Sequence, residues 1–242
     1  MLHLLLMATV LRTPVIEPTN PDPYTLSVRT VVGTATVSAL DGTKGRHKIE
    51  GALIGGSSIA TNGFVATGDK SSLILDLPDG CSVWVGPNTQ IQFVPYAANG
   101  HDWRLNRGVI VAKVSNEDTK HSFKVRPLLG QVMIKNGAVR VAQYLVKIPV
   151  PSVNVDVGAI EGTCEYTAWA RPKKDGGGLI KAGDEVQASI TPLQQPNSVS
   201  GPNLFIHPLS PSSEAEVKIL GASPEAFVQD SAKSNCALCS RR

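Results

Sequence analysis

The sequence predicts an all-β protein of many short strands, folded as a β-sandwich or β-roll and flanked at both ends by extended proline-rich arms. Turn pairs such as Asp-Gly, Asn-Gly and Gly-Gly recur from Leu26 onward, at the close spacing that short antiparallel strands need. Between these pairs, apolar and polar residues alternate, which is the period of a strand with one buried face. No stretch of useful length shows helical periodicity.

The clearest single element is a hairpin at residues 73–85. Two alternating runs supply its apolar row, namely Leu73, Leu75, Leu77, Cys81, Val83 and Val85. A two-residue turn would put Leu75 opposite Trp84, whereas a three-residue loop keeps every member of the row on one face. Proline suits the start of a type I turn, and glycine accepts the left-handed position that closes such a loop. The predicted loop therefore consists of Pro78, Asp79 and Gly80.

The predicted register turns Trp84 to the face opposite the leucine row, beside Ile74. There the indole is either covered by a second layer, because a large aromatic side chain buries well, or exposed as the central contact of a binding surface. Trp103 and Trp169, which lie near charged turns, are candidate rim residues of the same kind. The candidate interaction residues in the domain are therefore Trp84 and Trp103.

The motifs around the hairpin follow one another in a definite order. Residues 63–89 combine a Thr-Gly pair, alternating leucines, an Asp-Gly turn, a second alternating strand and a Gly-Pro-Asn-Thr run. Shorter pieces lie on either side, at residues 33–37, 51–54, 105–111, 123–125, 153–162 and 179–184. This order resembles the FecR family of cell-envelope domains over residues 30–190. The resemblance implies an exported, all-β, non-enzymatic domain of signalling type that binds a protein or another ligand.

Two departures from the family pattern limit what the resemblance implies. Residues 134–139 read Ile-Lys-Asn-Gly-Ala-Val, where many family members carry Arg-Gly-Thr. The sequence also lacks the cytoplasmic anti-sigma segment and the spanning helix that precede the domain in iron-signalling relatives. Binding of a sigma factor is therefore not predicted.

Outside residues 30–190 the chain divides into four segments. Residues 1–12 resemble the hydrophobic part of a signal peptide, although no basic residue precedes the apolar run and no Ala-x-Ala motif follows it. That run is shorter than the roughly 20 residues of a spanning helix. Prolines make residues 13–29 an extended arm and residues 191–213 a linker. Residues 214–242 are expected to hold one strand, one short helix and a tail.

The four cysteines leave several pairings open. Cys81 and Cys164 lie in alternating runs and are expected either as buried thiols or in disulfides. Cys236 and Cys239 form a single C-x-x-C near the end of the chain, where a zinc site would need two more ligands at short spacing. A tail disulfide, an intermolecular bridge or no role at all fits this motif better.

No catalytic residue, metal or cofactor is expected. The five histidines share no ligand spacing, and neither a G-x-S-x-G motif nor a phosphate-binding loop occurs. The net charge of +3 is small for 242 residues, and the basic residues are scattered without stacking aromatics. This pattern does not indicate nucleic-acid binding.

Two functions from different classes remain. The first is a non-enzymatic binding module of the periplasm, cell envelope or cell surface. The alternative is a structural subunit of a surface filament or layer, assembled when a terminal arm adds to the open sheet edge of a neighbour or of another copy. The apolar arm residues available for such contacts are Val15, Ile16 and Phe205.

Overall fold

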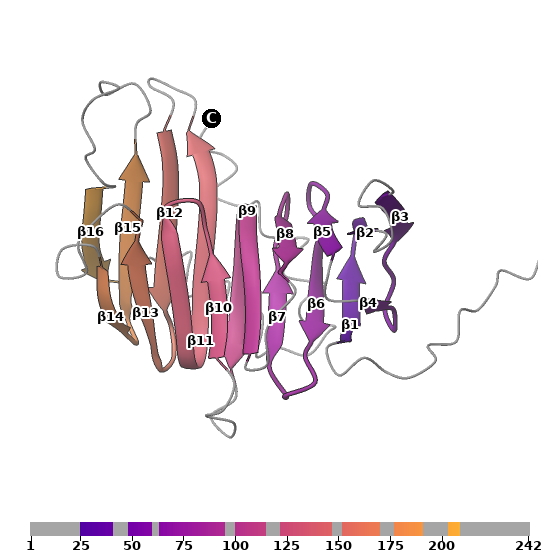
Figure 1. Cartoon of the computed structure of the whole chain (residues 1–242), viewed down its shortest axis with the longest axis horizontal. Coiled ribbons are helices and arrows are strands. Elements are labelled where there is room, and N and C mark those ends of the chain that lie inside the picture. The colour runs from indigo at the N-terminus through magenta and orange to yellow at the C-terminus, as the bar shows by residue number, and fades with distance from the viewer. Residues whose placement is uncertain are drawn as a thin grey trace, which may run out of the picture.

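The structure is a computed structural model in which every regular element is a β-strand among the residues described. These residues are 25–40, 48–59, 63–94, 100–114, 122–146, 152–169, 177–190 and 203–208. Figure 1 shows strands β1 to β8 at one end of the molecule and β12 to β16 at the other, with β9 and β11 between them. The all-β fold class predicted from the sequence is confirmed.

The strands form two sheets that share two long strands. Sheet A runs in the order β4 (Ser58–Ile59), β1 (Leu26–Val32), β6 (Ser72–Asp76), β7 (Ser82–Val85), β9 (Gly100–Val114), β11 (Gly130–Val146), β12 (Ser152–Ala159), β15 (Asp184–Ile190) and β16 (Asn203–Pro208). Sheet B runs in the order β3 (Lys48–Ala52), β2 (Ala35–Leu40), β5 (Gly63–Thr67), β8 (Gln90–Phe93), β9, β10 (Ser122–Arg126), β11, β13 (Thr163–Ala168) and β14 (Gly177–Lys181). In the described part of the chain, β9 and β10 are the parallel pair and the other pairs are antiparallel.

Strands β9 and β11 pass from sheet B to sheet A at glycines. Gly108 has a φ of +89° and Gly137 a φ of +82°, which side chains rarely tolerate. A Cβ at Gly108 would also collide with Thr89, and one at Gly137 with the backbone of Glu161. Both bends therefore require glycine, and they place the two halves of each strand in different sheets.

One apolar core lies between the sheets and takes side chains from both. Val65 and Ile91 come from sheet B, whereas Leu75 and Val157 come from sheet A, and all four are fully buried. A smaller cluster lies on the other face of sheet A and consists of Ile74, Trp84, Val109, Val111 and Ala142. The alternation read from the sequence therefore divides residues between a main core and an outer face.

The hairpin of β6 and β7 has the register that a three-residue loop requires. Leu75 pairs with Val83, and the backbone N–H of Leu77 donates to the carbonyl of Cys81 at 3.0 Å. Gly80 has a φ of +79°. The buried row is the one expected, with exposures of 0 to 5% for Leu73, Leu75, Leu77, Cys81, Val83 and Val85.

Two expected segment boundaries need correction. Strand β1 begins at Leu26, inside the region 13–29 that was expected to be an arm, because Leu26 and Val28 are buried in the core. Asn203–Pro208, within the expected linker 191–213, forms strand β16 against β15. The proline of this strand, Pro208, is its last residue, and β16 pairs with β15 alone among the described strands. A proline there removes no hydrogen bond from the interior of the sheet. The rest of that linker and residues 1–24 and 209–242 lie outside the described residues.

Candidate interaction pocket

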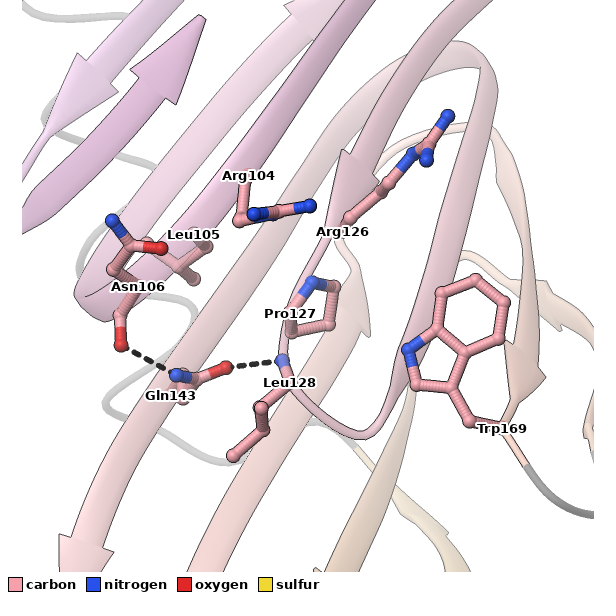
Figure 2. A pocket seen from close by; sticks show the side chains of 8 residues that line it. All are labelled: Arg104, Leu105, Asn106, Arg126, Pro127, Leu128, Gln143 and Trp169. Carbon is pink, nitrogen blue, oxygen red and sulfur yellow. Dashed lines mark hydrogen bonds between the residues drawn. The ribbon is translucent and has the colours of Figure 1, made fainter. Parts of the chain in front are cut away.

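A cavity of about 510 Å³ opens where the end of β10 approaches the bend of β9. Its volume falls within the roughly 300–1,000 Å³ typical of ligand sites. Figure 2 shows Trp169 on one side of the turn between β10 and β11, and Asn106 and Gln143 on the other. The lining residues are Arg104, Leu105, Asn106, Arg126, Pro127, Leu128, Gln143 and Trp169.

The side chain of Gln143 holds one wall of the cavity together. Its Nε2 donates to the carbonyl of Asn106 at 2.6 Å, and its Oε1 accepts from the backbone N–H of Leu128 at 2.5 Å. Gln143 itself is 7% exposed. This buried amide therefore ties the bend of β9 to the turn between β10 and β11.

The opposite wall is anchored through Leu129. The backbone N–H of Trp169 donates to the Leu129 carbonyl at 3.0 Å, and the hydroxyl of Tyr166 donates to the same oxygen at 3.1 Å. The Leu129 side chain is buried, whereas Leu128 is 60% and Trp169 44% exposed. Two large apolar side chains are thus held open to solvent at the mouth of the cavity by fixed backbone.

The third part of the site is basic. Arg104 in β9 and Arg126 in β10 are directly opposite each other in the parallel pair, and Asp102 is opposite Lys124 one step earlier on the same face. Asp102 is 4% exposed and forms an ion pair with Arg126, while the Lys124 ammonium is 4.0 Å from the same carboxylate. Arg104 has no ion pair in the part of the chain that the structure describes. The cluster of Asp102, Arg104, Lys124 and Arg126, here called the basic cluster, therefore carries surplus positive charge.

The chemistry of the lining favours binding over catalysis. The eight lining side chains include no serine, cysteine, histidine, aspartate or glutamate. Arginine remains protonated in proteins and serves as a donor, and the amides of asparagine and glutamine do not titrate. The pocket therefore offers hydrogen-bond donors, apolar surface and positive charge, but neither a nucleophile nor a general base.

A second charged group, here called the sheet A cluster, lies on the outer face of sheet A and is buried. Arg140 in β11 and Glu185 in β15 are 3.4 Å apart, across the backbone of Gly158 in the strand between them. The hydroxyl of Tyr144 donates to Asp156, and Gln187 Nε2 donates to the other oxygen of Asp156 at 3.2 Å. Burial raises the pKa of Asp156 and the nearby charge of Glu185 adds to this effect, although Tyr144 and Arg140 oppose it.

A third pair connects the predicted loop to sheet B. His101 Nε2 lies 2.8 Å from Asp79 Oδ2, and both side chains are 11% exposed. Burial by itself raises the pKa of Asp79, but the hydrogen bond and charge of His101 and the backbone N–H of Cys81 outweigh it and lower that pKa to about 2. The loop residue Asp79 therefore connects the hairpin to β9 through its bond with His101.

The sequence-predicted interaction residues do not meet in one place. Trp84 is 5% and Trp103 2% exposed, so both lie within packed clusters, and the hot-spot interpretation of an exposed indole does not apply to them. Phe205 is in β16, and Val15 and Ile16 lie outside the described residues. Trp169 is the tryptophan that lines the cavity. The sequence analysis missed Arg104, Arg126 and Leu128. For the two arginines the available signal was a polar position that alternates with buried Trp103, Leu105 and Val125.

The cysteines within the described residues are buried. Cys81 is 5% and Cys164 0% exposed, and Cys164 is a free thiol whose pKa is raised by burial to about 12. Cys236 and Cys239 lie outside the described residues. Within the described ranges, no group of three or more His, Cys, Asp or Glu side chains is arranged to hold a metal ion, and no helix has the length and apolar character to cross a membrane.

Comparison with known proteins finds a family match for the central part of the chain. Residues 64–161 match the family model of the FecR protein. The FecR resemblance read from the sequence is thereby confirmed over this range, which is narrower than the expected 30–190. The FecR match includes every lining residue of the cavity except Trp169.

Two solved structures are similar to part of this chain. Both are described as a "putative anti-sigma factor" from Parabacteroides distasonis ATCC 8503, with 13% sequence identity and TM-scores of 0.46 and 0.47. The matches cover 64% and 65% of this chain and 62% and 63% of those chains, so this chain spans less than two thirds of their length. A search of curated proteins found no match.

Proposed function

We propose that this chain is a non-enzymatic, FecR-like module of the bacterial cell envelope that acts by binding another protein through the cavity of Figure 2. One observation carries the proposal. The residues that match the FecR family include Asn106, Gln143 and Leu128, whose hydrogen bonds build one wall of the cavity. An extracytoplasmic location follows from the same family resemblance. Sigma-factor binding is not part of the proposal.

The surface around the cavity supports a protein partner. Leu128 and Trp169 are exposed beside two arginines, and this combination of aromatic, aliphatic and arginine side chains is enriched at protein interfaces. Both walls are fixed by hydrogen bonds from buried side chains, so little ordering is needed when a partner binds.

Site-directed crosslinking tests the proposal. A photoreactive amino acid is placed at position 128 and, in a matched control, at position 179, because Leu179 is also exposed, at 55%, but lies in β14 away from the cavity. In whole bacteria we expect a discrete crosslinked product from position 128 alone, and the captured protein, once purified, should bind the unmodified chain in solution. Identical product patterns from both positions, or no product from either, would contradict the proposal.

Sizing of the purified chain addresses the structural alternative. A binding module is expected to remain monodisperse as its concentration rises. Polymers that grow with concentration would favour a subunit that assembles through its terminal arms.

A further inference from the structure

We propose that the cavity binds an internal acidic segment of its partner, in which a glutamate or aspartate side chain contacts the two arginines and an adjacent large apolar side chain contacts Leu128 and Trp169. This inference rests on the proposed function and specifies the chemistry of the partner. Three observations carry it: the excess charge of the basic cluster, the apolar mouth beside it and the bonding of the Leu128 backbone N–H to Gln143.

The positive charge of the basic cluster is not balanced within the described residues. Lys124 and Arg126 share the single carboxylate of Asp102, and Arg104 on the same face has no ion pair among the described residues. The next carboxylate on this face, Glu165, is 3.8 Å from Lys135 and thus belongs to another pair. Like charges directly opposite each other on neighbouring strands are destabilising. A carboxylate from outside relieves this repulsion and accepts the paired N–H groups that a guanidinium presents.

The interior of the basic cluster is also incompletely bonded. Asp102 Oδ1 and Arg126 Nε are buried, and neither has a hydrogen-bond partner in the described part of the chain. Asp102 therefore bonds to Arg126 through one oxygen only, and the Arg126 side chain, which is 36% exposed, lines the cavity.

The apolar mouth argues against a simple inorganic anion or a neutral sugar. Leu105, Pro127, Leu128 and Trp169 make half of the lining, and phosphate has no apolar group to place against them. A neutral sugar can stack on an indole but does not compensate two adjacent arginines. A peptide with a carboxylate beside a leucine or aromatic side chain satisfies both halves of the site.

An internal carboxylate fits better than a chain terminus. Capture of a terminal carboxylate commonly uses a set of free backbone N–H groups. Here the N–H of Leu128 is already donated to Gln143, and Pro127 has none. At this turn the arginine side chains, and not the backbone of residues 127 and 128, are therefore the donors beside the apolar mouth, which suits a carboxylate carried on a side chain.

Calorimetric titration of the full chain with defined peptides tests this inference. The probe is an acetylated and amidated hexapeptide with glutamate beside leucine, and its counterparts carry glutamine for glutamate or serine for leucine. We expect the glutamine counterpart to bind about tenfold more weakly or worse, since one charge-assisted hydrogen bond contributes about 1.5–3 kcal/mol. Binding of the parent peptide should weaken as salt rises.

Variants of the chain test whether the peptide binds in the cavity. Arg104→Gln and Trp169→Ala should each weaken the parent peptide, whereas Arg107→Gln, on the same strand but outside the cavity, and Leu179→Ala should not. Arg104→Glu should reverse the preference, so that a lysine-for-glutamate peptide binds better than the parent.

Several results would overturn the inference. Equal affinity for the glutamate and glutamine peptides, an unchanged affinity in Arg104→Gln, or tighter binding of a free-terminus peptide, of inorganic phosphate or of a neutral cell-wall saccharide would each do so. If position 128 still crosslinks to a protein while acidic peptides fail to bind, the assigned chemistry is wrong but the proposed function stands. If position 128 captures no protein, the function itself fails.

Discussion

The two sheets each carry a charged cluster, but the two clusters lie in opposite surroundings. In the sheet A cluster, Arg140 is 1%, Glu185 3% and Asp156 6% exposed, and each carboxylate has a donor. In the basic cluster of sheet B, Arg104 is exposed and Arg126 half-buried, and the one carboxylate lies among three cations and pairs with two of them.

This difference follows from the cost of removing charge from water. A buried charge without a partner is expensive, so the sheet A cluster is compensated internally and contributes to the fold. Side chains that reach water can remain uncompensated, so the basic cluster keeps unused donors. The comparison indicates that Arg140 in the sheet A cluster stabilises the fold, whereas Arg104 in the basic cluster is available for binding. Four measurements test this difference.

The largest effect is expected from Arg140→Met. Removing the guanidinium leaves Glu185 buried without this cation, which typically costs about 3–5 kcal/mol of stability. Urea denaturation at neutral pH measures the loss. The control is Arg29→Met, which breaks the more exposed pair with Asp76 and should cost no more than about 1 kcal/mol. Similar losses in both variants would remove the distinction between buried and exposed clusters.

Asp102→Asn should have an intermediate effect. The substitution keeps the shape of the side chain but removes the charge that holds Arg126, and we expect a loss of about 1.5–3 kcal/mol. Adding Arg104→Gln to this variant should restore part of the stability, because it reduces the repulsion among the cations. Glu165→Gln, an exposed carboxylate on the same face, serves as the control in the same denaturation series. No loss in Asp102→Asn would mean that this carboxylate does not hold the cluster.

The pair of His101 and Asp79 tests whether a single compensated pair behaves like the sheet A cluster. The pKa of Asp79 is lowered from 3.8 to about 2, so its ionised form is favoured in the folded chain. Its contribution to stability is therefore complete above about pH 4 and is lost as the pH falls towards 2. Asp79→Asn should be less stable than the parent at pH 5, and the two denaturation midpoints should converge near pH 2. Parallel pH curves would show that this charge adds nothing to the fold.

The smallest effect on stability is expected from Arg104→Gln. Because Arg104 is exposed and has no ion pair among the described residues, the free energy of unfolding should change by less than about 0.5 kcal/mol. The same denaturation series measures it. A large loss would place Arg104 with the structural arginines and would weaken the case for a binding role.

The sequence predicted what local chemistry controls. Alternation fixed which side chains of the hairpin face inward, and the Pro78-Asp79-Gly80 loop fixed its register, because turn type and strand period are properties of neighbouring residues. The all-β class followed from the same two signals repeated along the chain. The family resemblance also depended on the local order of motifs, and it holds over residues 64–161.

The tertiary structure alone decided the candidate site and the edge of sheet A. Arg104 and Arg126 meet because β9 and β10 pair in parallel, and Trp169 joins them because its backbone bonds to Leu129. Strand β16 formed in a proline-rich stretch because an edge position tolerates proline. Trp84 became buried in the cluster that it forms with side chains from other strands of sheet A, and Trp103 became buried in the main core against Phe93 and Phe123. Alternation in the sequence predicts which side chains point away from the core. Contacts between distant segments determine whether such a side chain is exposed to water, packed in a second cluster or paired with another charge.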